Sequence, residues 1–153
     1  MSQLNKPNRS QQFLYNDFDV QLPNMLNHIL DGELKKGKYY GIHFFRDQHH
    51  QIQEVTKQPT QNGIWEAKIK IQHHRTKAWV KKEKASTFFP LCWQQDELVE
   101  KLKEAYICRK KIFSYKHIGH TSCGIKIAFF FRNKNVVSCF PIYPSVQQNE
   151  ELK

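Results

Sequence analysis

Polar and apolar positions follow clear periods in parts of this chain, and each period predicts an element of secondary structure. Residues 64–72 (IWEAKIKIQ) carry an apolar side chain at every second position, which predicts a strand buried on one face. The turn signal Asn62-Gly63 precedes this strand. Residues 73–76 are expected to form a hairpin loop, after which Ala78 starts a partner strand.

Two segments have apolar residues at helical spacing. The first runs from Leu22 to Leu30. Pro23 suits its first turn, and Gly32 is expected to end it. The second helix is expected over residues 94–108, where the apolar side chains gather on one face. These side chains are Leu98, Val99, Leu102, Ala105 and Tyr106.

The remaining segments predict loops early in the chain and strands late in it. Residues 33–41 have the composition of a basic loop with aromatics, and residues 46–62 that of a polar loop rich in Gln and His. Three strands are expected near the end, at residues 112–115, 124–131 and 136–143. This order predicts the α+β class. An N-terminal helical part and a mid-chain helix would pack on one face of a single twisted antiparallel sheet.

The length of 153 residues suits one domain, which we expect over residues 16–145. Residues 1–15 would be a loose polar arm and residues 146–153 a polar tail. No apolar run reaches the roughly 18 residues that a membrane span requires, and the polar N-terminus lacks the apolar core of a signal peptide. Secretion or delivery by a dedicated system, and excision from a longer toxin, stay open.

Charge and aromatic content narrow the class of partner. The chain has 24 Lys or Arg against 14 Asp or Glu, a formal charge of +10, and aromatic residues make up 13% of it. Such an aromatic content excludes a disordered chain. The positive charge favours a polyanionic partner, either nucleic acid or an acidic protein.

Cysteine and histidine positions argue against a metal site. No two cysteines form a CxxC pair. They are Cys92, Cys108, Cys123 and Cys139. Their apolar neighbours predict buried, reduced thiols and therefore a reducing cytoplasm as the place of action. The histidine doublets at residues 49–50 and 73–74 are expected at the surface, and the HxxH pair at residues 117–120 lacks further ligands.

The sequence lacks the common motifs of nucleotide-binding and serine-hydrolase sites, whereas His and Lys are abundant. The chain has no nucleotide-binding glycine loop and no GxSxG motif. Two imidazoles and a lysine suit metal-free RNA cleavage: one takes the proton of the ribose 2′-OH, the other protonates the leaving 5′-oxygen, and the lysine neutralises the phosphorane. His28 and His43 are candidates, although by spacing alone each is more typical of a structural histidine.

The stretch from His28 to Phe45 (HILDGELKKGKYYGIHFF) resembles the first catalytic block of the EndoU ribonuclease superfamily, in its bacterial toxin-type form. In that block a His within H-[IF]-[LV]-x-G is followed by a second His within G-x-H. The spacing between His28 and His43 matches this block. Gly32 and Gly41 occupy the matching glycine positions.

Three further blocks follow in the order found in the family. Residues 62–71 (NGIWEAKIKI) resemble N-G-[VI]-[YW]-E-A-K-[VI]. Residues 84–93 (KASTFFPLCW) resemble K-x-S-T-F-F-P-x-x-W, and residues 138–141 (SCFP) resemble the closing T-x-Y-P. The resemblance therefore covers roughly residues 22–145, and it implies the small α+β ribonuclease fold.

The resemblance also implies catalytic roles. His43 would be the general base on the 2′-OH and His28 the general acid, and the two roles could be exchanged. The lysine of the family, which stabilises the transition state, falls on Lys84, with Lys81 and Lys82 as alternatives in register.

The closing block implies contacts to the substrate. Ser138 would contact the base or its phosphate. The family has a tyrosine where this chain has Phe140, which can stack on a base but has no hydroxyl, so we expect weaker uridine preference. Tyr143 would supply a hydroxyl, although alternation along a strand puts it on the face opposite to Phe140. Tyr39 and Tyr40 are alternative stacking rings, or anchors that hold the loop on the sheet.

We therefore expect an endoribonuclease of single-stranded RNA, such as tRNA, that leaves 2′,3′-cyclic phosphate and 5′-hydroxyl ends and acts as an antibacterial toxin or effector module. No cofactor is expected, and no carboxylate cluster indicates a site for a stimulating Mn²⁺ ion. The expected partners of the monomer are RNA and an acidic cognate immunity protein. Two alternatives remain: a catalytically inactive RNA-binding module on the same fold, favoured by Phe140, and a toxin whose basic face binds a membrane or an acidic protein.

Overall fold

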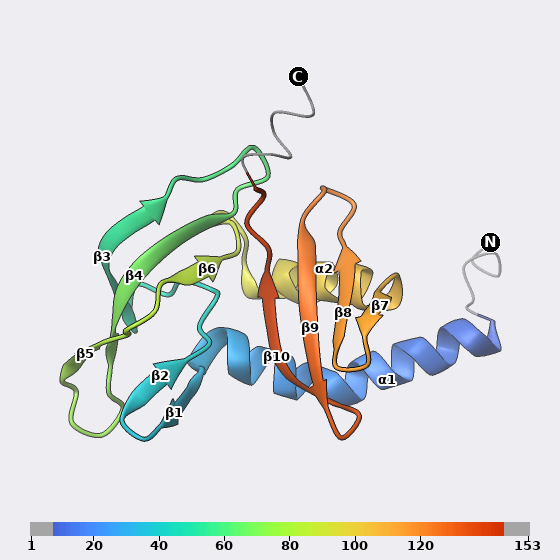
Figure 1. The fold of residues 1–153 in the computed structure, drawn as a ribbon, viewed down its shortest axis with the longest axis horizontal. Helices are drawn as coiled ribbons and strands as arrows, with labels where there is room; N and C mark the ends of the chain where they lie inside the picture. Colours follow the sequence, from blue (N-terminus) through green and yellow to red (C-terminus); the bar gives the residue numbers. More distant parts are fainter. Residues whose placement is uncertain (1–7, 146–153) are drawn as a thin grey trace.

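The computed structural model describes residues 8–145, so residues 1–7 and the predicted tail at 146–153 lie outside it. Its helices are α1 (Arg9–Leu26), the π-helix η2 (Asn27–Asp31) and α2 (Gln95–Ile107). Its strands are β1 (Glu33–Lys35), β2 (Lys38–Tyr40), β3 (His50–Lys57), β4 (Trp65–Gln72), β5 (Trp79–Lys81), β6 (Ser86–Phe88), β7 (Lys110–Phe113), β8 (Lys116–His120), β9 (Lys126–Arg132) and β10 (Asn135–Pro141). This arrangement confirms the predicted α+β class (Figure 1). Within residues 8–145, no helix is long and apolar enough to cross a membrane.

The strands form separate sheets, which differs from the single sheet expected. One antiparallel sheet has the order β10-β9-β8-β7, and a second has the order β3-β4-β5, with β6 also paired to β4. β1 and β2 form a small hairpin of their own. The buried apolar side chains fall into two clusters, one on β4 and β6 and one between the helices and the β7–β10 sheet. Each large sheet thus has its own apolar cluster, and the two stand side by side in Figure 1.

Both α-helices pack against the same face of the β7–β10 sheet. The ring centroid of Tyr106 in α2 lies 5.8 Å from that of Phe18 in α1 and 5.3 Å from that of Phe129 in β9. Gly119 of β8 approaches α2 so closely that an added Cβ would lie 1.8 Å from the carbonyl oxygen of Ala105. In Figure 1, α2 lies behind β8 and β9, so the face turned to the viewer is the one away from this helix.

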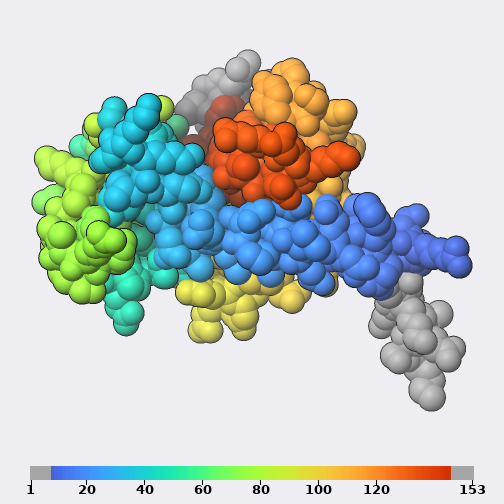
Figure 2. Space-filling model, turned by 90° about the horizontal axis from the view of Figure 1, so that it is seen from below, coloured from blue at the N-terminus to red at the C-terminus, as the bar shows by residue number. Residues whose placement is uncertain are grey.

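The N-terminal helix is longer than predicted. It begins at Arg9, so residues 9–15 are helical and not part of a loose arm. The Asn8 side chain accepts a hydrogen bond from Gln11 N–H at 2.8 Å, and the Gln11 side chain accepts one from Asn8 N–H at 3.0 Å, which caps the helix. Pro23 lies inside the helix rather than in its first turn. The first turns of α1 extend beyond the body of the molecule, which explains why they lack an apolar stripe (Figure 2).

Strands occupy two segments that were predicted as loops. β3 lies within residues 46–62, and every side chain in it after His50 is exposed, so no apolar alternation marks it. β1 and β2 lie within residues 33–41, joined by a turn in which Lys36 and Gly37 both have positive φ. Exposure of these strands removes the period-2 pattern on which the prediction depended.

The four cysteines are free thiols. Cys139 is buried, as predicted. The other three differ from the prediction, because Cys92, Cys108 and Cys123 are exposed. Trp93, next to Cys92, is the side chain that enters the core at that point.

Candidate active site

A pocket of about 610 Å³ lies where β10 of one large sheet meets β6 of the other. A neighbouring hollow of about 620 Å³ shares part of its wall and opens above α1, between the β1–β2 and β9–β10 hairpins (Figure 2). Eight of the ten candidate residues named from the sequence line the first pocket: His28, Tyr39, Tyr40, His43, Lys82, Lys84, Ser138 and Phe140. Residues from four distant parts of the chain thus meet at one place.

Lys81 is one exception, and Tyr143 is the other. Its hydroxyl donates a hydrogen bond to the carbonyl of Gln58 at 2.8 Å, and the ammonium of Lys57 lies 5.0 Å from the centre of its ring. It lines a different hollow from Phe140. Tyr143 therefore lies apart from Phe140, as the alternation of side chains along a strand had indicated. Its position does not agree with the prediction that its hydroxyl contacts the substrate beside Phe140.

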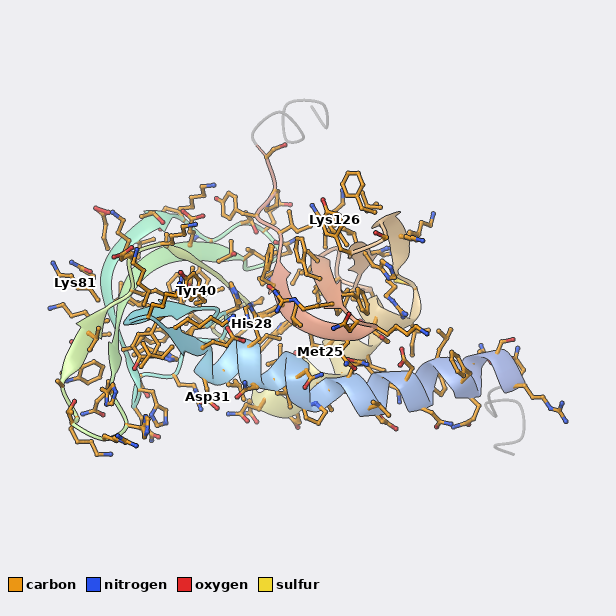
Figure 3. The ribbon with its side chains drawn as sticks, turned by 60° about the horizontal axis from the view of Figure 1, so that its bottom comes forward. Met25, His28, Asp31, Tyr40, Lys81 and Lys126 are labelled. Carbon is orange, nitrogen blue, oxygen red and sulfur yellow. The ribbon has the colours of Figure 1, made fainter. Side chains whose placement is uncertain are left out.

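His28 is held by both of its ring nitrogens. It lies on η2, a π-helical turn of the kind that often carries functional residues, and its side chain is buried. Its Nδ1 is 3.0 and 3.1 Å from the two carboxylate oxygens of Glu33, and its Nε2 is 3.2 Å from Ser138 Oγ. A carboxylate only accepts hydrogen bonds, so Nδ1 donates to Glu33 in a charge-assisted contact. Figure 3 shows His28 between the β1–β2 hairpin and β10.

The backbone joins the second histidine directly to the first. The N–H of Ile42 donates to the carbonyl of His28 at 2.9 Å, and the N–H of His43 donates to the carbonyl of Ile29 at 2.8 Å. Gly41 and Ile42 have φ of 84° and 68°. A Cβ on Gly41 would lie 2.6 Å from the His28 carbonyl oxygen and 3.0 Å from its ring, which explains the glycine. The left-handed conformation of the β-branched Ile42 is strain stored beside the pocket.

His43 is a neutral imidazole with a defined tautomer. Its Nδ1 lies 2.7 Å from the carbonyl oxygen of Thr87, which can only accept, so Nδ1 carries the hydrogen and Nε2 the lone pair. Burial, followed by the charges of His28 and Lys82, lowers the pKa of His43 to about 3. The ring centroids of the two histidines are 5.3 Å apart, close enough for one phosphodiester group to contact both.

Lys82 is the lysine that the fold buries in the pocket wall. Its ammonium donates to the carbonyl oxygen of Lys84 at 2.9 Å. Burial and the charge of Lys84 lower the pKa of Lys82 to about 8. Lys84 also lines the pocket, but it is exposed, and Lys81 lies at the outer edge of its sheet, far from His28 (Figure 3). Of the three lysines that the sequence motif left as alternatives, Lys82 has the environment expected of a catalytic cation.

β10 contributes Ser138 and Phe140 from one face. A β-bulge between Val136 and Ser138 shifts the register with β9. Cys139, between the two site residues, points into the core. The Phe140 ring centroid is 5.5 Å from that of His43, so the aromatic ring closes one side of the pocket.

Three residues that support the site were missed in the sequence. Glu33 and Thr87 orient the two imidazoles as described. Arg46 donates to the carbonyl of Leu30 at 2.7 Å and to Asp31 at 2.8 Å, and so anchors the end of η2. Glu33 follows a motif glycine directly, which is a weak signal, whereas a backbone carbonyl such as that of Thr87 leaves none.

His50 and the HxxH pair have structural surroundings. His50 is buried, against the prediction, and its Nδ1 accepts a hydrogen bond from Arg46 N–H at 3.0 Å. His117 accepts one from Arg109 Nε at 3.0 Å, while His120 lies near Cys108. In the part of the chain that the structure describes, no group of three or more His, Cys, Asp or Glu side chains is placed to hold a metal ion.

Comparison with known proteins places the chain in a family. The model of the family described as bacterial EndoU nuclease matches residues 23–143, which include every residue that lines the pocket. The chain belongs to the bacterial EndoU nuclease family. The EndoU resemblance found in the sequence is therefore confirmed, and the pocket is the candidate active site of an EndoU nuclease.

The EndoU domain also has a relative among toxins. It is 30% identical over 124 residues to a protein of Bacillus cereus named "Toxin", a match that covers 78% of this chain. The match spans only 22% of the length of that relative. No solved structure matches the chain.

Proposed function

We propose that this EndoU domain is an endoribonuclease that cleaves single-stranded RNA by attack of the ribose 2′-OH on the adjacent phosphorus. The single observation that carries the proposal is the pair of imidazoles, 5.3 Å apart, with opposite electrostatic partners. We assign the acid role to His28, whose Nδ1 donates to the Glu33 carboxylate, and the base role to His43, whose neutral form is favoured by burial and by the charges of His28 and Lys82. One acid and one base are therefore ready in the same pocket.

The chemistry needs no group from outside the pocket. His43 Nε2 takes the proton from the 2′-OH, and the oxygen attacks phosphorus to form the new P–O bond. His28 gives its Nε2 proton to the 5′-oxygen as the P–O5′ bond breaks. The products are a 2′,3′-cyclic phosphate and a 5′-hydroxyl, and the two histidines end with exchanged protonation states. The tautomer of His43 and the carboxylate beside His28 support this assignment over the reverse one.

Lys82, in place of Lys84, would stabilise the charge that develops on the phosphorane oxygens. Its ammonium is partly desolvated, which strengthens its interaction with an anion, whereas Lys84 is exposed to water. We expect Lys82→Ala to lower kcat by about 10²-fold and Lys84→Ala to lower it by less than about tenfold. Steady-state cleavage of a labelled RNA oligonucleotide measures both. Equal losses, or a larger loss for Lys84→Ala, would return the role to Lys84.

Ser138 and Phe140 would contact the nucleotide beside the cleaved bond. Ser138 Oγ lies 3.2 Å from His28 Nε2. When substrate binds, the Ser138 hydroxyl can exchange this contact for a hydrogen bond to a phosphate oxygen or to a base edge. Phe140 offers a ring for stacking, which all bases accept. Tyr39 and Tyr40 line the same pocket and are further stacking rings. A site with this composition would prefer uridine only weakly.

In biological terms, the domain would be the toxic module of an antibacterial effector, with RNA such as tRNA as its substrate in the cytoplasm of a target cell. The similarity to a protein named "Toxin" supports this role. A formal charge of +10 suits both an RNA substrate and an acidic immunity protein that covers the pocket. We propose that the domain acts as a monomer, because a single chain supplies every group that the proposed mechanism uses.

The decisive experiment identifies the ends of the products. Purified protein is incubated with total RNA in EDTA, and the fragments are tested for a 2′,3′-cyclic phosphate and a 5′-hydroxyl. We expect discrete fragments with these ends, because imidazoles and a lysine perform the proton transfers and the charge neutralisation. Fragments with 3′-hydroxyl ends, or activity that depends on added Mn²⁺, would reject the mechanism. Binding without fragments would favour the inactive RNA-binding module, the alternative that Phe140 supports.

The acidic side of the pH profile tests the role of His43. Because its pKa is about 3, His43 stays neutral as the pH falls, and kcat/KM is expected not to fall between about pH 7 and pH 5. A base with the ordinary pKa of about 6.5 would be only about 3% neutral at pH 5. A fall in kcat/KM with a midpoint near pH 6.5, with circular dichroism showing an intact fold, would identify a different base.

A further inference from the structure

A row of four aromatic rings leads away from the candidate active site across the β7–β10 sheet. We call Phe140, Phe130, Tyr115 and Phe113 the aromatic row. Phe140 is its first member, with its ring centroid 5.5 Å from that of His43. Successive centroids are 5.6, 6.4 and 5.5 Å apart, with interplanar angles of 19°, 26° and 12°. The rings are therefore close to parallel from the pocket to the edge strand.

The row lies on the face of the sheet away from the helices. In β9, Phe129 packs into the core with α2, so Phe130, the next residue, points to the opposite face. The far members of the row are open to solvent: Phe113 is 53% and Tyr115 is 54% exposed. Exposing two large aromatic rings to water is energetically unfavourable, and the domain already has two apolar clusters in which such rings could be buried. An exposed aromatic group of this kind marks a binding surface.

The charge around the row suits a nucleic acid. Residues 105–145, which include all four strands of the sheet, contain seven Lys or Arg and no Asp or Glu. The ammonium of Lys116 lies 5.5 Å from the centre of the Phe130 ring. Lys116 and Lys126 also line a hollow of about 1100 Å³ on this part of the molecule. Cations that flank a path of aromatic rings can bind phosphates while the rings stack on bases.

We propose that the aromatic row binds the bases of a single-stranded RNA segment that continues out of the catalytic pocket. The physical mode is that of other four-stranded antiparallel sheets that stack about two or three bases on exposed aromatics. The inference rests on the proposed function for the direction of the path, because Phe140 joins the row to the imidazoles. It predicts that the enzyme selects unpaired RNA longer than a dinucleotide, since a base in a duplex cannot reach the rings.

The test compares a dinucleotide with an oligonucleotide of about eight nucleotides. Phe113→Ala combined with Tyr115→Ala is expected to raise KM for the longer RNA by about tenfold or more and to leave kcat/KM for the dinucleotide unchanged. Phe113→Tyr with Tyr115→Phe keeps two rings and should restore the wild-type KM. Phe13→Ala removes another exposed phenylalanine, 71% exposed on α1, and should change KM for neither substrate. Equal effects on both substrates, or none on the longer one, would overturn the proposal.

Binding to an RNA that cannot be cleaved separates this proposal from the catalytic one. A fluorescent RNA with 2′-O-methyl groups lacks the attacking hydroxyl, and its anisotropy reports affinity alone. The double alanine variant should lose about tenfold or more in affinity and keep the wild-type salt dependence, whereas Lys116→Gln should reduce the slope of log K against log salt by about one. Loss of affinity in a protein that cleaves no RNA would keep the row and reject the catalysis. Unchanged affinity would mean that the row serves another partner, such as a protein.

Discussion

Replacing His43 or His28 with alanine is expected to lower kcat/KM for RNA cleavage by about 10²- to 10⁴-fold, the usual loss when a general base or acid is removed. His43→Ala removes the lone pair that receives the 2′-OH proton. His28→Ala removes the proton donor to the leaving oxygen and leaves Glu33 without its partner. Both effects act on the chemical step, so kcat should fall more than KM rises. Cleavage of a labelled oligonucleotide under single-turnover conditions measures this step directly.

Two other histidines provide matched controls. His49→Ala changes an exposed side chain and should leave both activity and stability as in the wild type. His50→Ala removes a buried imidazole outside the pocket and leaves the N–H of Arg46 without its acceptor. Thermal unfolding should therefore show a loss of stability, with the rate per folded molecule little changed. Full activity of folded His28→Ala or His43→Ala would remove that residue from the mechanism.

The sequence predicted elements well wherever burial imposed a period on it. β4 alternates between buried and less buried side chains along its whole length, and both it and α2 were found with nearly correct limits. β3 pairs with β4 over most of the same length but is exposed after His50, so only its partner strand carried a signal. The division into two sheets was also not predictable, because it depends on which face of β4 is buried against which cluster.

The sequence motifs predicted which residues form the site but not the environment of each side chain. The motif glycines Gly32 and Gly41 have physical reasons in the structure, since a Cβ on either would strike backbone atoms of the neighbouring segment. The choice between Lys82 and Lys84 could not be made from the sequence. The two residues are close in the chain and of the same type, and only the turn between β5 and β6 buries one of them. The different environments of His28 and His43 depend in the same way on Glu33 and on a backbone carbonyl.

The largest effect is expected from the substrate rather than from the protein. A single 2′-deoxy substitution in the nucleotide before the cleaved bond should abolish cleavage at that position, because it removes the oxygen that attacks phosphorus. In this pocket, two imidazoles and a lysine provide proton transfer and charge neutralisation, and the mechanism assigns no side chain as a replacement nucleophile. Capillary electrophoresis of end-labelled RNA would show whether the band at that position disappears.

The matched control carries the 2′-deoxy group one nucleotide further from the bond, where cleavage should persist near the rate of the unmodified RNA. This comparison separates the loss of the nucleophile from a change in sugar conformation or in binding. The anionic phosphate remains in both substrates, so the salt dependence of binding should also be the same. Cleavage at the substituted position, or of an all-DNA strand, would mean that water or a protein group attacks phosphorus. In that case His43 Nε2 would activate a nucleophile other than the 2′-OH.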